Sequence, residues 1–142
     1  MKDQDGFTLI ELMVVILIIA ILIAIAIPTF LGLRQRAQNR AAQSNLRNAM
    51  TAAKAFYTDN ETYVGFTEAV AEGIEPSLNF NTGAASVANQ VSIRDLAAGT
   101  VALSTLSASG TVYCIAETAP GTTGEGTGEA ATAAACVATA DW

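Results

Sequence analysis

An apolar run close to the N-terminus constrains the fold of this chain more than any other feature. From Leu12 to Leu33 there are 22 residues without a formal charge, between Glu11 and Arg34. A helix of about this length can cross the hydrocarbon core of a bilayer. The apolar residues are not confined to one helical face, as they are in the surface helix of a globular protein. The sequence therefore predicts a helix whose whole circumference suits lipid.

The helical pattern continues beyond the apolar run, but with a polar face. Apolar residues recur at spacings of three and four, as in an amphipathic helix. These residues are Ala42, Leu46, Ala49, Met50, Ala53, Phe56 and Tyr57. We expect one long helix from about Thr8 to about Tyr57, roughly 75 Å in length at 1.5 Å per residue. The turn-forming residues of Thr58–Thr62 should end it.

Pro28 disturbs the backbone hydrogen bonding of this helix, although the helical sequence pattern continues beyond it. A proline cannot donate a hydrogen bond to the carbonyl of Ala24, and its ring crowds the preceding turn. Gly32 follows one turn later. We expect a kink or a weak point between Pro28 and Gly32.

The remaining residues, 58–142, must fold around a thin core, since only a few of them are aromatic. Residues 66–73 suggest a short helix, and residues 100–107 and 111–117 flank Ala108-Ser109-Gly110 as two strands of an antiparallel hairpin. Residues 86–96 are ambiguous. The segment Thr118–Ala135 is rich in Gly, Thr and Ala, and predicts a mobile surface loop. The expected fold class is α+β, a long N-terminal helix packed on a small antiparallel sheet.

Two cysteines, Cys114 and Cys136, lie near the C-terminal end of the sequence. A disulfide between them would stabilise a small domain by about 3 kcal/mol and would require an oxidising compartment. Two reduced thiols in the core are the alternative. We favour the disulfide, because a domain with so thin a core often needs a covalent link.

The formal net charge of −6 is unevenly distributed along the sequence. Between Arg34 and Lys54 there are five basic residues and no acidic ones, whereas eight acidic residues and only Arg94 follow Phe66. The acidic part argues against nucleic acid as a partner. The basic part could lie against anionic lipid headgroups or form a solvated helix face, and these two interpretations are compatible.

The sequence offers little material for catalysis or for metal binding. It contains no histidine, no zinc motif and no nucleophile paired with a base, so we expect no enzyme, no cofactor and no metal. The glycine-rich "GTTGEGTGE" lacks the Lys-Ser/Thr of a phosphate-binding loop. Glu68, Glu72 and Glu75 have the spacing of a solvated helix face. Asn60-Glu61-Thr62 fits the N-glycosylation pattern, but turn formation is the preferred interpretation.

The informative constellation is Gly6, Phe7 and Glu11 directly before the apolar run. A secretory signal peptide has its apolar stretch before the cleavage site. Cleavage after Gly6 would instead leave that stretch in the mature chain, so the stretch must have a second role after insertion. This N-terminus, with its short polar leader, "G-FTLIE" motif, apolar span and Pro28, resembles the type IV pilins.

The resemblance implies a pilin fold and a division of the chain into four parts. They are a leader peptide (1–6), a transmembrane and assembly helix (7–33), its amphipathic continuation (34–57), and a globular head (58–142) with a disulfide-bounded loop between Cys114 and Cys136. It further implies that a prepilin peptidase cuts between Gly6 and Phe7 and methylates the Phe7 amine. The subunit would wait in the cytoplasmic membrane until ATP-driven machinery polymerises it into a surface filament.

The same resemblance implies a role for Glu11 in assembly. In a filament of staggered helices, its carboxylate could pair with the Phe7 amine of a neighbouring copy and set their axial register. The alternative is that Glu11 only lies among the lipid headgroups. Leu9, Ile10, Leu12–Ile27 and Phe30 would form the apolar core of the filament, and the helix would loosen between Pro28 and Gly32.

Two other functions remain open alongside the pilus subunit. A pseudopilin of a type II secretion system shares the N-terminal motif, and a membrane-tethered binding protein would use the helix only as an anchor. One observation conflicts with the pilin orientation, because Arg34, Arg36 and Arg40 outweigh Lys2 and would place the C-terminal side in the cytoplasm. We give the motif more weight, because large domains are translocated despite charge.

Overall fold

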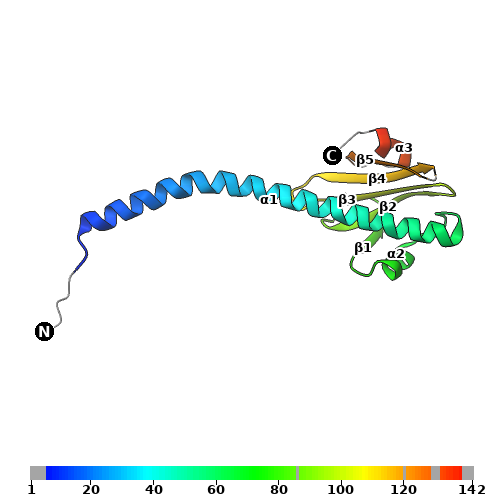
Figure 1. Cartoon of the computed structure of the whole chain (residues 1–142), viewed down its shortest axis with the longest axis horizontal. Helices are drawn as coiled ribbons and strands as arrows, with labels where there is room; N and C mark the ends of the chain where they lie inside the picture. The colour runs from blue at the N-terminus through cyan, green and yellow to red at the C-terminus, as the bar shows by residue number, and fades with distance from the viewer. Residues whose placement is uncertain (1–5, 86, 120, 129–131, 139–142) are drawn as a thin grey trace. The chain divides into compact units, whose positions relative to one another are not determined.

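The computed structural model describes residues 6–85, 87–119, 121–128 and 132–138. Within these ranges the chain forms three helices and one five-stranded sheet (Figure 1). In chain order they are α1 (Leu9–Asn60), α2 (Glu68–Ile74), β1 (Asn79–Thr82), β2 (Gln90–Ala97), β3 (Thr100–Leu106), β4 (Val112–Ala119), β5 (Thr122–Thr127) and α3 (Ala133–Ala138). The chain divides into two compact units, Met1–Arg36 and Ala37–Trp142. The predicted α+β class and its long N-terminal helix are confirmed.

The first unit contains the apolar part of α1. Every large apolar side chain from Phe7 to Leu33 is exposed, with Phe7 at 92%. The most apolar window of α1 has a mean hydropathy of 3.3, so α1 is a candidate membrane span by length and composition. Pro28 lies inside α1 without ending it. The expected kink between Pro28 and Gly32 stays a prediction.

In the second unit, the last part of α1 packs on the sheet, as its amphipathic pattern predicts. Its buried residues are Ala42, Leu46, Ala49, Met50, Ala52 and Ala53. They share one apolar core with side chains of the sheet, among them Val101 and Leu103 of β3. The helix ends at Asn60, three residues later than expected, and Glu61 follows with a left-handed φ of 55°.

The sheet has the strand order β1-β2-β3-β4-β5. β1 is parallel to β2, and the other neighbours are antiparallel. The predicted hairpin is confirmed as β3 and β4, in which Leu106 pairs with Val112. Gly110 has a φ of 92° in the turn between them, a conformation that is accessible to glycine at little cost.

Two interior strands of the sheet, β3 and β4, are buried on both faces. Side chains alternate between the faces of a strand. Val101, Leu103 and Ile115 therefore belong to the core beneath α1, whereas Ala102 and Cys114 belong to a second core with α3. A second covering layer over these small residues explains how a head with so few large side chains buries its central strands.

The expected mobile loop at Thr118–Ala135 is wrong. Its described residues contain the end of β4, the whole of β5 and the start of α3. β5 exists because its backbone pairs with β4 from Tyr113↔Thr127 to Ala119↔Thr122. The ambiguous segment 86–96 contains most of β2, and β1 was not predicted. Trp142 and most of the leader lie outside the described residues.

The pattern Asn60-Glu61-Thr62 takes part in local turn hydrogen bonds. The Asn60 side-chain amide donates to the Phe56 carbonyl at 2.9 Å, and the Val64 amide donates to the Thr62 hydroxyl at 3.1 Å. These bonds close the end of α1, which supports the turn interpretation of the pattern.

Candidate functional site

The first turn of α1 brings together the residues that the N-terminal motif singled out. The Thr8 backbone amide and hydroxyl both donate to Oε2 of Glu11, at 2.9 and 2.8 Å. The Glu11 amide is 3.3 Å from the Thr8 hydroxyl, to which it donates in return. These reciprocal bonds are a capping box, which satisfies amides that have no partner within the helix. Glu11 therefore has a local structural role besides any role between subunits.

Thr8 is a functional residue that the sequence analysis missed. The signal was present, because Thr8-Leu9-Ile10-Glu11 follows the pattern of Ser/Thr followed three residues later by Glu or Gln. Gly6 and Phe7 precede this cap and are exposed. The bond between Gly6 and Phe7 thus lies immediately outside the first helical turn. Residues 1–5 of the expected leader lie outside the described part of the chain.

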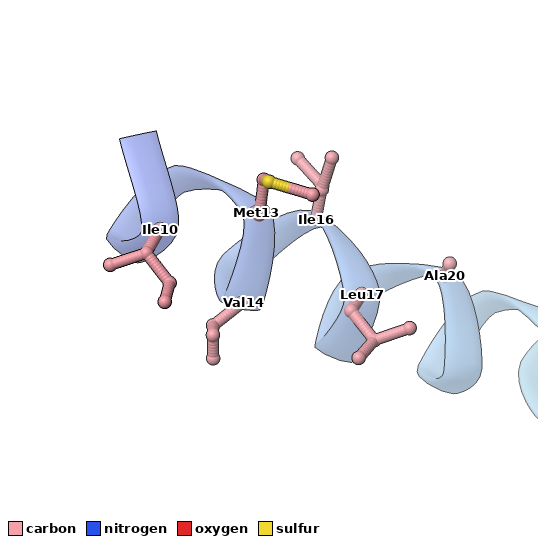
Figure 2. Close-up of a pocket in the computed structure, with 6 residues that line it drawn as sticks. All are labelled: Ile10, Met13, Val14, Ile16, Leu17 and Ala20. Carbon is pink, nitrogen blue, oxygen red and sulfur yellow. The ribbon is translucent and has the colours of Figure 1, made fainter. Parts of the chain in front are cut away.

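An open apolar surface begins directly after the cap. Six residues of α1 line it: Ile10, Met13, Val14, Ile16, Leu17 and Ala20. Figure 2 shows their side chains projecting from successive turns, with the Met13 sulfur as the only heteroatom among the drawn side chains. A second apolar surface lies between Leu22 and Leu33. Such surfaces are stable only in lipid or against other apolar helices, because exposing them to water costs about 25 cal/mol per Å².

Pro28 and Gly32, the expected weak point, lie in the second half of this apolar segment. The Thr29 hydroxyl donates to the Ile25 carbonyl at 3.2 Å, within the turn that contains the proline. A Cβ added at Gly32 would meet no atom within 4 Å. Gly32 is therefore not required by packing in the isolated chain, and any need for it must arise from helix flexibility or from a neighbour.

The head contains a buried charge that the sequence analysis did not identify. Glu117 of β4 is only 3% exposed, and its Oε2 lies 3.3 Å from Nζ of Lys54 on α1. Its Oε1 accepts from the Gly121 amide at 3.0 Å. Burial and the negative charge of Glu117 raise the pKa of Tyr63 above its ordinary range. The carboxylate is stabilised in the core by Lys54, because an unpaired buried charge would be costly.

Two basic residues of α1 form polar contacts with β5. Lys54 donates to the Thr123 hydroxyl at 2.8 Å, and Arg47 pairs with Glu125 at 3.2 Å. Both partners on β5 lie in the stretch that was expected to be a loop. These contacts explain in part why a glycine- and threonine-rich segment forms a strand here.

Replacing Lys54 with methionine should lower the free energy of unfolding of the head by about 2 kcal/mol. Removing one partner of a buried ion pair costs roughly 3–5 kcal/mol, and the partial exposure of Lys54 reduces that cost. The measurement is urea unfolding of the full chain in detergent. Arg47→Met is the matched control and should cost less than about 1 kcal/mol, because its ion pair with Glu125 is exposed. Equal effects of the two variants would contradict the buried role of the Lys54–Glu117 pair.

Cys114 and Cys136 form a disulfide in the structure, with their Cα atoms 5.9 Å apart and a sequence separation of 22. The bond joins β4 to α3. Together with Ala102, Ala116 and Ala133 it forms the second core of the head. The disulfide therefore holds α3 against the sheet face opposite α1.

The remaining candidates have local structural roles. The Phe80 amide donates to Glu72 at 3.2 Å, and the Ser77 hydroxyl donates to Glu75 at 2.5 Å. Among the described residues, no group of three or more His, Cys, Asp or Glu side chains could hold a metal ion. Most of the glycine-rich "GTTGEGTGE" forms β5, so it is part of the sheet and not a phosphate-binding loop.

Comparison with known families identifies the N-terminal segment. Residues 1–27 match the prokaryotic N-terminal methylation motif. This match covers Gly6, Phe7 and Glu11 and the apolar run as far as Ile27.

Three relatives illustrate the proteins to which the chain is similar. It is 36% identical over 92 residues to the type IV major pilin protein PilA of Myxococcus xanthus, covering 65% of this chain and 42% of the relative. It is 43% identical over 63 residues to the type IV wide pilus major component PilA4 of Thermus thermophilus, covering 44% and 48%. It is 35% identical over 63 residues to the type II secretion system core protein G of Vibrio cholerae, covering 44% and 43%. The matched stretches thus span about half or less of these relatives.

Proposed function

We propose that this chain, whose N-terminus carries the prokaryotic N-terminal methylation motif, is a structural subunit of a type IV pilus. One observation carries the proposal. A capped Glu11 directly precedes an apolar helical segment that is exposed around its whole circumference. Capping alone does not require a charge at that position, because an uncharged glutamine would also complete the capping box. Similarity to the major pilins of Myxococcus xanthus and Thermus thermophilus supports the same function.

The proposed subunit is made by processing at the motif. A prepilin peptidase cleaves between Gly6 and Phe7 and methylates the new Phe7 amine. The exposed position of both residues outside α1 is suited to this cleavage. The product retains the apolar helix, so the mature chain stays in the cytoplasmic membrane until it is assembled.

Glu11 acts in assembly through the part of its carboxylate that the cap does not use. Thr8 contacts Oε2, which leaves Oε1 for the amine of Phe7 in a neighbouring copy. Between apolar helices the local dielectric is low, so the attraction of this pair is strong and its loss leaves a costly buried charge. The pair sets the axial register of the two helices.

The proposed partners follow from these steps of cleavage, retention in the membrane and assembly. The chain contacts membrane lipid first and then other copies of itself in a helical homopolymer, with an ATP-driven machine in the cytoplasmic membrane. The filament is displayed on the cell surface and serves adhesion, motility or DNA uptake. We propose a structural role without enzymatic activity, cofactor or metal, and without a direct nucleic-acid site.

The second candidate is a pseudopilin of a type II secretion system. It is supported by similarity to core protein G of Vibrio cholerae and by the shared N-terminal motif. A membrane-tethered binding protein is the third candidate and is the weakest, because it explains the cap but not the charge of Glu11 next to an apolar segment.

The test is to shear filaments from intact cells and to determine the N-terminal residue and the intact mass of this chain. The expected chain begins at Phe7, carries one methyl group in place of an amine hydrogen and is lighter by two hydrogens for the disulfide. Its presence in the sheared fraction distinguishes the pilin from the pseudopilin, whose fibre would stay within the cell envelope. A chain found only in membranes, with residues before Phe7 still attached, would refute filament assembly.

A further inference from the structure

The charged residues of this chain are separated into two blocks. Arg34–Lys54 contains five basic residues and no acidic one. The segment between Lys54 and Arg94 contains five acidic residues and no basic one, namely Asp59, Glu61, Glu68, Glu72 and Glu75. If these charged residues served only solubility, positive and negative residues would be interspersed along the chain.

Pairing within the head uses only part of the basic block. Arg47 and Lys54 pair with Glu125 and Glu117, both from outside the acidic block. Arg34, Arg36 and Arg40 are exposed, and no ion pair to them is found in the described part of the chain. Arg36 and Arg40 lie four residues apart and share one face of α1, whereas Arg34 lies on another face. Neither Arg36 nor Arg40 has an ion pair among the described residues.

The acidic block also contains side chains that form no ion pair among the described residues. Glu72 and Glu75 accept hydrogen bonds from Phe80 and Ser77. Asp59 and Glu61, at the end of α1, are exposed and form no ion pair with any described residue. These two carboxylates are the accessible counterpart of the free arginines.

The unpaired basic residues and the unpaired acidic residues of one chain cannot contact each other. Arg40 and Asp59 lie on the same helix, about 28 Å apart at a rise of 1.5 Å per residue. We propose that Arg36 and Arg40 of one copy, which form one basic surface on α1, bind Asp59 and Glu61 of another copy within the filament. This inference rests on the proposed polymerisation, and it adds a contact between subunits outside the apolar core.

The arrangement has two consequences. Each copy offers a basic surface to one neighbour and an acidic surface to another, so the contact is heterologous and propagates into an open polymer. The two copies that share it are staggered by an axial distance on the order of 30 Å. A helical filament has neighbours at several axial offsets, so this pair of copies need not be the pair joined by Glu11 and Phe7.

Charge reversal on each surface tests the contact. The two single-surface variants are R36E/R40E and D59K/E61K, and the third variant combines them. The fold should tolerate them, because these side chains are exposed and a cation at position 59 suits the last turn of a helix. R36K/R40K is the matched control that preserves charge.

The readout is the yield of sheared filaments, normalised to the amount of subunit in the membrane. Each single-surface reversal is expected to lower the yield at least about tenfold, which corresponds to about 1.4 kcal/mol. The combined variant should recover most of it, because the two reversed surfaces are again complementary. The lysine control should match the wild type, and the contact should weaken at high salt.

Wild-type yield in both single-surface variants, or no recovery in the combined variant, would overturn the inference. Neither result would contradict the proposed function as a filament subunit. Loss of the arginine variants from the membrane, whatever the acidic surface carries, would also overturn it and would assign the arginines to lipid headgroups. A wild-type chain that forms no filaments would refute the proposed function and this inference together.

Discussion

Replacing Glu11 with alanine is expected to reduce surface filaments to background while the chain still enters the membrane. A charged residue inside a bilayer costs roughly 2.5–3.5 kcal/mol at the helix centre, so its removal cannot hinder insertion. Assembly, by contrast, would leave the neighbouring Phe7 amine without its partner among apolar helices. The measurement compares sheared filaments with membrane-bound subunit in the same cells.

Thr8→Val is the graded control for this experiment. It removes the hydroxyl that contacts Glu11 but keeps the carboxylate and the Thr8 backbone amide bond. Loss of a capping side chain costs about 1 kcal/mol, so filaments should decrease without disappearing. Normal filaments from Glu11→Ala would show that the capping box is the whole role of Glu11 and that assembly does not depend on its charge.

Replacing both cysteines with serine is expected to lower the free energy of unfolding of the head by about 3 kcal/mol. The bond closes a loop of 22 residues, and the chain-entropy model assigns a closure of that size about this value. The change should first release α3, whose apolar contacts are with the small residues Ala102 and Ala116. Urea unfolding of the full chain in detergent, followed by circular dichroism, measures the effect.

Reduction of the wild-type chain provides the matching control for the cysteine variant. Wild type treated with a thiol reductant should unfold at the same urea concentration as the double serine variant. If the reduced wild type were as stable as the oxidised wild type, packing of α3, and not the covalent link, would hold this side of the head together.

The sequence by itself determined the features that depend on neighbours along the chain. The apolar run predicts the exposed part of α1, because its length, its apolar composition and its absence of charge are local properties. The spacing of Leu46, Met50 and Ala53 likewise predicts the face of α1 that is buried against the sheet. The hairpin of β3 and β4 was predictable because one short turn, containing Gly110, joins two apolar strands.

Only the tertiary structure decided the features that depend on partners far away in sequence. The composition of β5 suggests a loop, yet pairing with β4 and contacts of Thr123 and Glu125 with α1 make it a strand. β1 is four residues long and joins β2 in parallel, without a local turn that would reveal the pairing. Lys54 appears on the sequence as one charge of a solvated face, but its partner Glu117 is buried 63 positions later. Strand pairing and burial of a charge are settled by the free energy of the assembled core, and no segment carries that information alone.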